Sequence, residues 1–489
     1  MMASSIADLQ DIVLLRQALG RLDPGSAHQA NIPPKPENIF TPYSHANALD
    51  PQRALVVGNR GVGKSFWSSV LTHSEARDKV APTYPRLSLS QIRAALGFHE
   101  AAGKDDGAAP SPALLVSLNQ SGYAADEIWR GVLVKAVAAE LSFVVPGSLS
   151  SLLLWSRENV EESEALLRAA DAHFVKNNQV FLLVFDALDR LGRDWNSIRS
   201  LTQGVLRLAL DMRGFRAMKA KIFMRSDQSK DDSLFAFADA SKIRSDAVSL
   251  VWRHRELFGW LYSYLSRDRE AGASFVRLVG GGDLTKLRPT MLTDSEVQQE
   301  IFYRLAGEFM GAGPKRGRTY TWLYDHLSDT FGETSPRSFI TAMQRAADFQ
   351  PAPRDHAVDH LGIRAGVQAA SRVRVQQLKE DYDWIDKVMA ALRGLEVPCD
   401  PEVFLARWRE RGTVADLRSE ADGEARRLPI ELTTAPSRDE GGLLAALQAI
   451  GVIEFRTPYR INMPDIFRVD AGIKRRGGIR PPSARREQS

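Results

Sequence analysis

The chain has only one cysteine, Cys399, among its 489 residues. A single cysteine excludes an internal disulfide framework and any zinc or iron–sulfur site built from several cysteines, and it fits a reducing compartment. The nine histidines show neither an HExxH motif nor a paired spacing, so nothing in the sequence indicates a metal held by histidine.

Long apolar runs are also missing. No stretch of 18 or more apolar residues occurs, so the sequence contains no candidate for a helix that crosses a bilayer. The first residues, MMASSIADLQDIVLLRQAL, lack a basic start and carry Asp8 and Asp11 inside their apolar pattern. This pattern predicts an ordinary amphipathic helix without a signal or an anchor. We therefore expect a cytoplasmic protein with no membrane attachment.

The chain has little net charge. It carries 64 Lys and Arg against 60 Asp and Glu, a formal charge of +4, and this balance does not by itself indicate nucleic acid. Basic residues do gather near the C-terminal end, in a segment that contains Gly and Pro and has little to bury: Lys474, Arg475, Arg476, Arg480, Arg485 and Arg486. Residues 471–489 are therefore predicted to form a disordered basic tail.

The most informative motif is GNRGVGKS, which follows an apolar stretch at 54–57 and precedes a helix-like segment at 66–72. Its glycines allow successive backbone N–H groups to wrap a phosphate at a helix N-terminus. Lys64 is expected to reach the β- and γ-phosphate oxygens, and the Ser65 hydroxyl to bind Mg²⁺. The predicted nucleotide contacts are Gly58, Asn59, Arg60, Gly61, Val62, Gly63, Lys64, Ser65 and Phe66. ATP and Mg²⁺ are therefore the predicted cofactors.

A second apolar run, FLLVF at 181–185, leads directly into Asp186. In open α/β sheets ligands bind at the carboxyl ends of the strands, so Asp186 is predicted to be the carboxylate on the Mg²⁺ side. Asp189, three residues later, can lie near the same site and polarise the attacking water. Its alternative role is that of a helix N-cap.

Further short apolar runs alternate with helix-compatible segments. We expect strands at 114–118, 180–185, 221–224 and 248–251, and a loop or insertion at 97–112 that comes before the second strand. The alternation predicts an α/β fold with a parallel sheet covered on both faces.

The second half of the chain has helical spacing. The residues from 255 to about 347 predict a helical lid, in which the aromatic residues form core and His254 lies on the surface. Helices at 384–395, 402–409 and 442–450, followed by two short strands joined at Thr457 and Pro458, predict a winged helix.

The chain length suggests roughly two to four domains. The predicted divisions are 1–48 (N-terminal helix and lead-in), 49–254 (nucleotide-binding core), 255–350 (lid), 351–382 (linker), 383–470 (winged helix) and 471–489 (tail).

The two nucleotide motifs resemble those of P-loop ATPases of the AAA+ and STAND groups, over roughly residues 50 to 350. GNRGVGKS resembles their Walker A motif. LLVFDALDRL resembles the Walker B motif of STAND and KAP-type proteins, which often have an acid three positions after the first Asp. AAA+ proteins more often have Glu directly after it, where this chain has Ala187. The resemblance therefore assigns the water-orienting role to Asp189.

Three arginines match the AAA+ layout. Arg225, in KIFMRSD, corresponds to a sensor of the γ-phosphate, and Arg337, in SPRSF, to a second sensor in the lid. Arg244, in SKIRSDAVSL, falls where AAA+ rings carry an arginine finger that reaches a neighbouring subunit; the alternative is an exposed arginine with no such role. A finger in trans implies a homo-oligomer.

The sequence therefore predicts an ATPase whose nucleotide cycle moves the lid and the winged helix, as a switch or a slow motor. The alternative is a nucleotide-gated scaffold with little turnover, which Ala187 favours. The C-terminal domain resembles the winged helix of origin-recognition-type AAA+ proteins, and its arginines at 407, 409, 411, 456 and 460 suit either duplex DNA or a solvated face beside a protein partner. The resemblance also suggests a prokaryotic defence or mobile-element system.

Overall fold

The computed structural model describes residues 8–24, 31–103, 107–192, 195–423, 428–433 and 439–476. They divide into two compact units. One comprises Ala27–Val251, and the other Met1–Ser26 together with Trp252–Ser489. In the described part of the chain, no helix is both long and apolar enough to cross a membrane.

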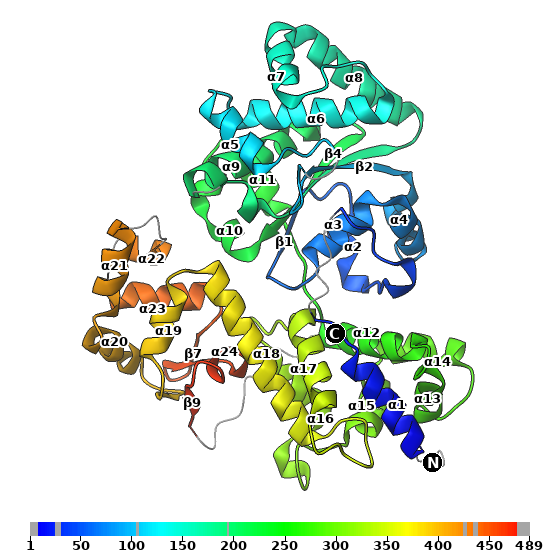
Figure 1. The fold of residues 1–489 in the computed structure, drawn as a ribbon, viewed down its shortest axis with the longest axis vertical. Coiled ribbons are helices and arrows are strands. Elements are labelled where there is room, and N and C mark those ends of the chain that lie inside the picture. Colours follow the sequence, from blue (N-terminus) through cyan, green and yellow to red (C-terminus); the bar gives the residue numbers. More distant parts are fainter. Residues whose placement is uncertain are drawn as a thin grey trace. The chain divides into compact units, whose positions relative to one another are not determined.

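The first unit is built around a five-stranded parallel sheet, as the sequence predicts (Figure 1). Its strand order is β2-β3-β4-β1-β5, so β4 lies between β1 and β3. The strands are β1 (Leu55–Gly58), β2 (Ile92–Phe98), β3 (Val180–Phe185), β4 (Met218–Arg225) and β5 (Val248–Ser249). The α/β fold with a parallel sheet is thus confirmed.

Helices cover both faces of this sheet. Phe185 packs edge-on against Trp129 of α6, whereas the next side chain, Asp186, bonds to Ser65 of α3. Because successive side chains of a strand point to opposite faces, α6 and α3 lie on opposite sides. The helices of the unit are α2 (Ala46–Leu49), α3 (Lys64–Thr72), α4 (Ser74–Val80), α5 (Pro112–Gln120), α6 (Ala125–Leu141), α7 (Leu149–Glu158), α8 (Val160–Lys176), α9 (Trp195–Asp211), α10 (Ser226–Lys230) and α11 (Ala240–Ser245).

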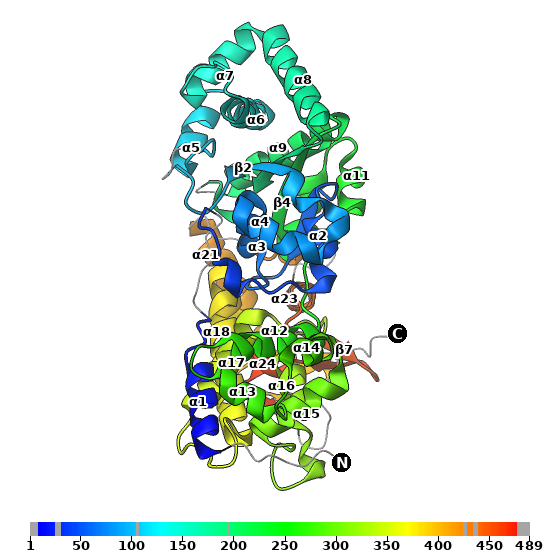
Figure 2. The ribbon, with the colours of Figure 1, turned by 90° about the vertical axis from the view of Figure 1, so that its right-hand side faces the viewer.

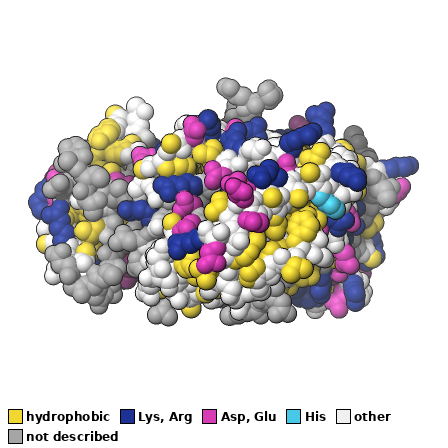
Figure 3. Space-filling model, turned by 90° about the horizontal axis from the view of Figure 1, so that it is seen from above, with side chains coloured by type: hydrophobic (Ala, Val, Ile, Leu, Met, Phe, Trp, Pro, Cys, Tyr) yellow, Lys and Arg dark blue, Asp and Glu magenta, His cyan; other side chains and the backbone are white. Residues whose placement is uncertain are grey.

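Helices α7 and α8 pack on α6 (Figure 2), and α8 also reaches the sheet, where Phe174 stacks on Phe181 of β3. On the face that Figure 3 shows, hydrophobic side chains gather in patches bordered by charged ones. Leu154 of α7 and Val160 of α8 are exposed, as is Val144, which precedes α7.

The strand predicted at 114–118 is wrong, because these residues lie in α5. The Ser111 hydroxyl caps this helix by accepting from Leu114 N at 3.2 Å, with Pro112 in its first turn. A short apolar run does not distinguish a strand from a buried helix, and here the cap and the proline decide.

The second strand is β2 (Ile92–Phe98), so residues 97 and 98 of the segment that was predicted to be a loop ahead of the second strand belong to that strand. Gly97 is part of β2, where an added Cβ would lie 2.6 Å from the Phe185 ring, so the glycine allows this close packing. Residues 104–106 of the predicted loop lie outside the described residues.

The second unit contains the helical lid. Its helices are α12 (His254–Arg267), α13 (Gly272–Leu278), α14 (Leu284–Thr293), α15 (Ser295–Ala306), α16 (Thr319–Leu327), α17 (Pro336–Asp348) and α18 (His360–Asp381). The expected surface position of His254 is wrong. Its ring stacks on Tyr324 with a centroid distance of 4.2 Å, and burial lowers its pKa to about 4.

Helix α1 (Leu9–Gly20) packs with this lid although the whole sheet unit follows it in the chain. Its Asp11 carboxylate pairs with Arg277 of α13, and the Tyr264 hydroxyl of α12 donates to Ala18 O at 3.1 Å. Arg21, directly after α1, pairs with Asp268 at 2.9 Å.

The winged helix follows the lid. Its elements are α19 (Ile385–Ala391), β6 (Glu396–Val397), α20 (Pro401–Glu410), α21 (Thr413–Gly423), α22 (Ile430–Thr433), α23 (Glu440–Ala449), β7 (Glu454–Arg456), β8 (Arg460–Asn462), α24 (Asp465–Arg468) and β9 (Lys474–Arg475). The three predicted helices and the antiparallel hairpin are present; α21 and α22, which lie between them, were not predicted. The backbone of Cys399, just after β6, forms an antiparallel β-bridge with Ile461 of β8. This bridge joins the β6 segment to the wing.

The start of the predicted tail is structured, because β9 pairs with β6. Arg480, Arg485 and Arg486 lie outside the described residues.

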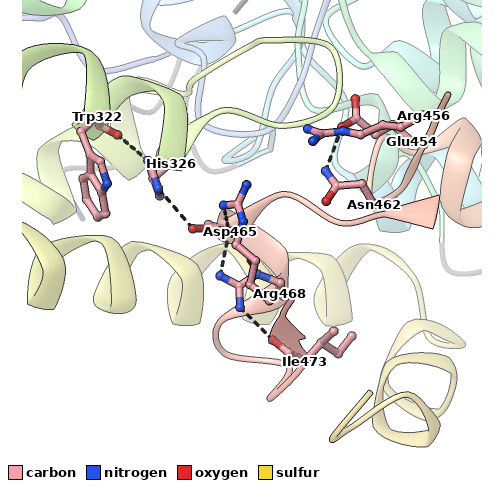
Figure 4. Close-up of polar contacts among 9 residues, drawn as sticks. Trp322, His326, Glu454, Arg456, Asn462, Asp465, Arg468 and Ile473 are labelled. Carbon is pink, nitrogen blue, oxygen red and sulfur yellow. Dashed lines mark hydrogen bonds and ion pairs between the residues drawn. The ribbon is translucent and has the colours of Figure 1, made fainter. Parts of the chain in front are cut away.

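One carboxylate links the lid to the winged helix within this unit (Figure 4). Asp465 of α24 lies 3.5 Å from His326 Nε2 of α16, and it accepts from Arg468 at 2.7 Å and from Arg475 at 3.3 Å. His326 Nδ1 lies 2.8 Å from Trp322 O. One continuous apolar core also runs from α1 through the lid to the winged helix, so the lid and the winged helix belong to a single body.

Candidate nucleotide-binding site

The loop between β1 and α3 has the backbone that the glycine pattern requires. Gly63 has φ +100°, in the left-handed region that favours glycine, and α3 begins at the next residue. At Gly58, a Cβ would lie 2.8 Å from Val62 Cγ2 and 3.2 Å from Leu250 O. Asn59, Arg60 and Val62 lie on this loop, and Phe66 lies in the first turn of α3.

Lys64, the first residue of α3, folds back over the loop. Its Nζ donates to Gly58 O and to Asn59 O, both at 2.9 Å. Burial lowers the pKa of this amine to about 8, while the nearby Asp186 carboxylate raises it. A phosphate group in the loop would offer the amine stronger, charged acceptors than the two carbonyls.

Asp186 follows β3 directly and is 2 % exposed. Its backbone N–H donates to Phe98 O at 2.9 Å, and its side chain bonds to the Ser65 hydroxyl. Burial raises the pKa of this carboxyl group, and its Oδ2 atom has no hydrogen-bond partner. Mg²⁺ binds carboxylate and hydroxyl oxygens. Asp186 offers a buried carboxylate oxygen that has no other partner, and Ser65 offers a hydroxyl beside it, so the two residues fit the predicted ion.

Arg225 and Asp189 lie at the same edge of the sheet. Arg225 ends β4, and its register partner is Gly58 of β1. Its Nη1 atom lies 4.0 Å from Asp189 Oδ2, and both side chains influence the pKa of Lys64. The structure therefore brings Lys64, Ser65, Asp186, Asp189 and Arg225 together.

Sequence reasoning missed Asp227, which pairs with Arg225 through two hydrogen bonds of 3.0 Å. The sequence gives no specific signal for it, because it is an acid in the first turn of α10 (Ser226–Lys230), directly after β4.

Ala187, where AAA+ proteins more often have Glu, adopts φ 57° and ψ 41°. The left-handed conformation is unfavourable for alanine, and it turns the chain sharply between Asp186 and the short helical turn that carries Asp189. Strain of this kind concentrates at functional sites.

Two predicted arginines lie on other elements. Arg244 of α11 pairs with Asp232 at 2.7 Å and lies 5.0 Å above the Phe235 ring, so it has partners within its own chain. Arg337 belongs to the other compact unit, at the second residue of α17. Their roles toward a nucleotide stay predictions.

The basic residues of the winged helix are partly neutralised. Arg409 pairs with Glu402 at 3.2 Å, and Arg456 with Glu454 at 2.7 Å. Helix α23, EGGLLAALQA, contains no Lys or Arg. Within the described residues, no group of three or more His, Cys, Asp or Glu side chains could hold a metal ion by itself.

No protein-family model and no curated protein matches this chain. Among solved structures, the chain is similar to the Walker-type ATPase of Pyrococcus abyssi, with 13% identity and a TM-score of 0.41, over 90% of this chain and 98% of that one. It is also similar to the ORC2 protein of Aeropyrum pernix in its ADPNP–ADP complexes, with 12% identity and a TM-score of 0.37, over 85% of each chain. Cdc6p from Pyrobaculum aerophilum matches with 13% identity and a TM-score of 0.27, over 86% of each chain.

Proposed function

We propose that this chain binds ATP with Mg²⁺ and hydrolyses it. The observation that carries the proposal is the arrangement of Lys64, Ser65 and Asp186. The lysine folds over a glycine loop, and a buried carboxylate with a partnerless oxygen bonds to the adjacent serine. This is the set of groups that phosphoryl transfer needs to bind the β- and γ-phosphates.

The chain's own residues then act on the nucleotide. The backbone N–H groups of the loop and the Lys64 ammonium hold the phosphates, and ATP binding favours the charged form of the lysine. Ser65 and Asp186 would hold Mg²⁺, which neutralises charge on the phosphate oxygens. Asp189 orients the attacking water, and Arg225 stabilises charge that develops on the γ-phosphate.

The cycle is proposed to work as a switch. Arg337 senses the γ-phosphate from the lid, so that loss of phosphate changes the lid position. Since one apolar core joins the lid to the winged helix, that change would move both. Arg244 supplies a finger to a neighbouring copy in a homo-oligomer.

Steady-state ATP hydrolysis across a protein concentration series tests the proposal, for wild type, Lys64→Ala and Asp189→Asn. We expect turnover that rises with concentration in wild type and collapses in both variants. Arg244→Ala should abolish the concentration dependence; full turnover in this variant would refute a finger in trans.

The second candidate is a nucleotide-gated scaffold, which Ala187 favours because no glutamate follows Asp186. It predicts tight ATP binding with negligible turnover in wild type, and loss of partner binding in Lys64→Ala. Finding multiple turnovers per protein that depend on Asp189 would reject it.

For the partner, we propose duplex DNA bound through the wing and the basic tail, within a prokaryotic defence or mobile-element system. Arg460 of the wing is exposed, and Lys474 lies at the start of the tail. Stimulation of ATP hydrolysis by duplex DNA with steep salt dependence would support this partner. Unchanged hydrolysis with DNA would favour a protein partner instead.

A further inference from the structure

Asp227 holds Arg225 at the edge of the candidate nucleotide site. Arg225 Nε donates to Asp227 Oδ1 and Arg225 Nη2 donates to Asp227 Oδ2, both at 3.0 Å. A bidentate pair of this kind fixes the plane of the guanidinium as well as its position, since both groups are planar. Asp227 is the second residue of α10, directly after β4, so the sheet sets its backbone position.

The pairing of Nε and Nη2 with Asp227 also sets the direction of the third guanidinium nitrogen, Nη1. Because Nε and Nη2 are bound by Asp227, Nη1 is directed toward Asp189, at 4.0 Å from its Oδ2 atom. The Arg225 side chain is 15% exposed and that of Asp227 is 26% exposed, so neighbouring groups limit how far the pair can swing.

The charges of Arg225 and Asp227 also act on Lys64, which follows the glycine loop. Arg225 lowers the pKa of Lys64, and Asp189 and Asp227 raise it. The backbone of Arg225 lies beside Gly58, the first residue of the loop, in the register of β1 and β4.

We propose that Asp227 is a positioning residue that holds Arg225 in the orientation needed to contact the γ-phosphate of ATP. The inference rests on the proposed function. Asp227 itself touches no nucleotide and acts through Arg225. Since ADP has no γ-phosphate, Asp227 should contribute to the discrimination between ATP and ADP more than to the affinity for ADP.

The experiment measures the Kd of Mg²⁺–ATP and Mg²⁺–ADP by fluorescence titration, together with kcat, for the full chain. Arg225→Ala should weaken ATP binding by about 10- to 100-fold and leave ADP binding unchanged. Asp227→Ala should lose part of the same ATP selectivity, and Asp227→Asn, which keeps one acceptor oxygen and the shape, should lose less. In the Arg225→Ala background, Asp227→Ala should have no further effect.

The matched control is Glu127→Ala. Glu127 binds Arg157 through the same two-point geometry, with both bonds at 2.9 Å, on helices of the same unit outside the site. This variant should keep the ATP/ADP affinity ratio of wild type.

Four outcomes contradict the proposal. Equal losses of ATP and ADP affinity in Asp227→Ala would indicate a purely structural role. A loss of ATP affinity in the Arg225→Ala, Asp227→Ala double variant that equals the sum of the two single losses would indicate the same. An Asp227→Ala protein that keeps full selectivity while Arg225→Ala loses it would refute positioning and leave the proposed ATPase function intact. Wild type that binds neither nucleotide would refute the proposed function itself, and the inference with it.

Discussion

Replacing Lys221 by methionine tests whether the sheet buries a lysine that has lost its charge. Lys221 lies in β4 with no exposed surface, and its Nζ donates to Asp50 O at 2.6 Å and to Arg53 O. Burial lowers its pKa to about 7. A neutral amine keeps two N–H groups, which are enough for the two carbonyls. Lys221→Met removes both the titration and the two donors.

The expected change in the free energy of unfolding follows from the difference in the pKa of Lys221 between the folded and the unfolded chain. The ordinary pKa of lysine is 10.5, so between about pH 7 and that value the unfolded chain holds a proton that the folded chain has lost. The free energy of unfolding should therefore rise with pH in this window. From pH 7 to pH 9 the two pKa values give a gain of about 2 kcal/mol, which Lys221→Met lacks. The variant also leaves two carbonyls unpaired, a cost of about 1–3 kcal/mol for each at either pH.

Hydrogen exchange of the β4 amides measures this difference, in the regime where reclosing is faster than exchange. The amide of Ile222, which donates to Ala54 O at 2.7 Å, is a suitable reporter. Comparing wild type with Lys221→Met at the same pH cancels the intrinsic exchange rate. The opening free energies should differ by about 2 kcal/mol more at pH 9 than at pH 7.

Lys219→Met is the matched control on the same strand. Lys219 is half-buried and donates to Phe215 O at 2.6 Å, and burial lowers its pKa without removing it from solvent. The effect of Lys219→Met on the opening free energy should therefore change less between pH 7 and pH 9. A difference between wild type and Lys221→Met that is the same at both pH values would refute the neutral buried lysine.

Three further substitutions follow from the described contacts. Gly58→Ala should abolish ATP binding, because its Cβ would lie 2.8 Å from a loop side chain, whereas Gly214→Ala, with nothing within 4 Å, should bind normally in the same titration. Asp186→Asn should lower kcat by about a hundredfold or more, because the amide no longer offers Mg²⁺ a carboxylate. It should also raise the melting temperature of the nucleotide-free protein, because burial raises the pKa of this carboxyl group and makes its charged form unfavourable. An unchanged kcat would remove Asp186 from the site. Asp465→Ala should destabilise the helical unit by about 1–3 kcal/mol, since it removes the carboxylate that two partly buried arginines, Arg468 and Arg475, share. Asp470→Ala, at a half-exposed carboxylate 3.7 Å from an exposed arginine, should change the unfolding midpoint little.

The glycine loop between β1 and α3 could be predicted because its conformation depends on consecutive residues. Glycines, a lysine and a serine must follow one another for the backbone to enclose a phosphate, and the sequence shows this order directly. Asp186 was predictable for a similar reason, since a buried strand leads straight into it. The structure adds the contacts around them: the Ser65 bond to Asp186 and the two loop carbonyls that Lys64 binds.

The misassigned elements were those whose composition is ambiguous. β2, with the sequence IRAALGF, has only one β-branched residue, so it does not have the composition typical of a strand. α5, with PALLVSLNQ, offers the short apolar run that strands also show. Asp227 could not be singled out because an acid in the first turn of a helix is common, and only the bidentate distances reveal its partner.

Side-chain pairs far apart in the sequence were beyond prediction. Nothing in the sequence near Asp11 indicates Arg277, which is 266 positions later. His254 looked like a surface residue because arginines flank it, but the two tyrosines that cover it come from α16.

The pairing of α1 with α13 has a consequence for synthesis on the ribosome. Helix α1 leaves the exit tunnel before the entire sheet unit, and the arginine that pairs with Asp11 is made 266 residues later. At about 5–20 residues per second, the apolar face of α1 waits on the order of 10–50 s for its partners. During that interval Ile12, Leu15 and Leu19, all buried in the finished protein, have no lid to cover them. During synthesis the apolar face of α1 is therefore open to aggregation, and a chaperone that binds short apolar segments could cover it.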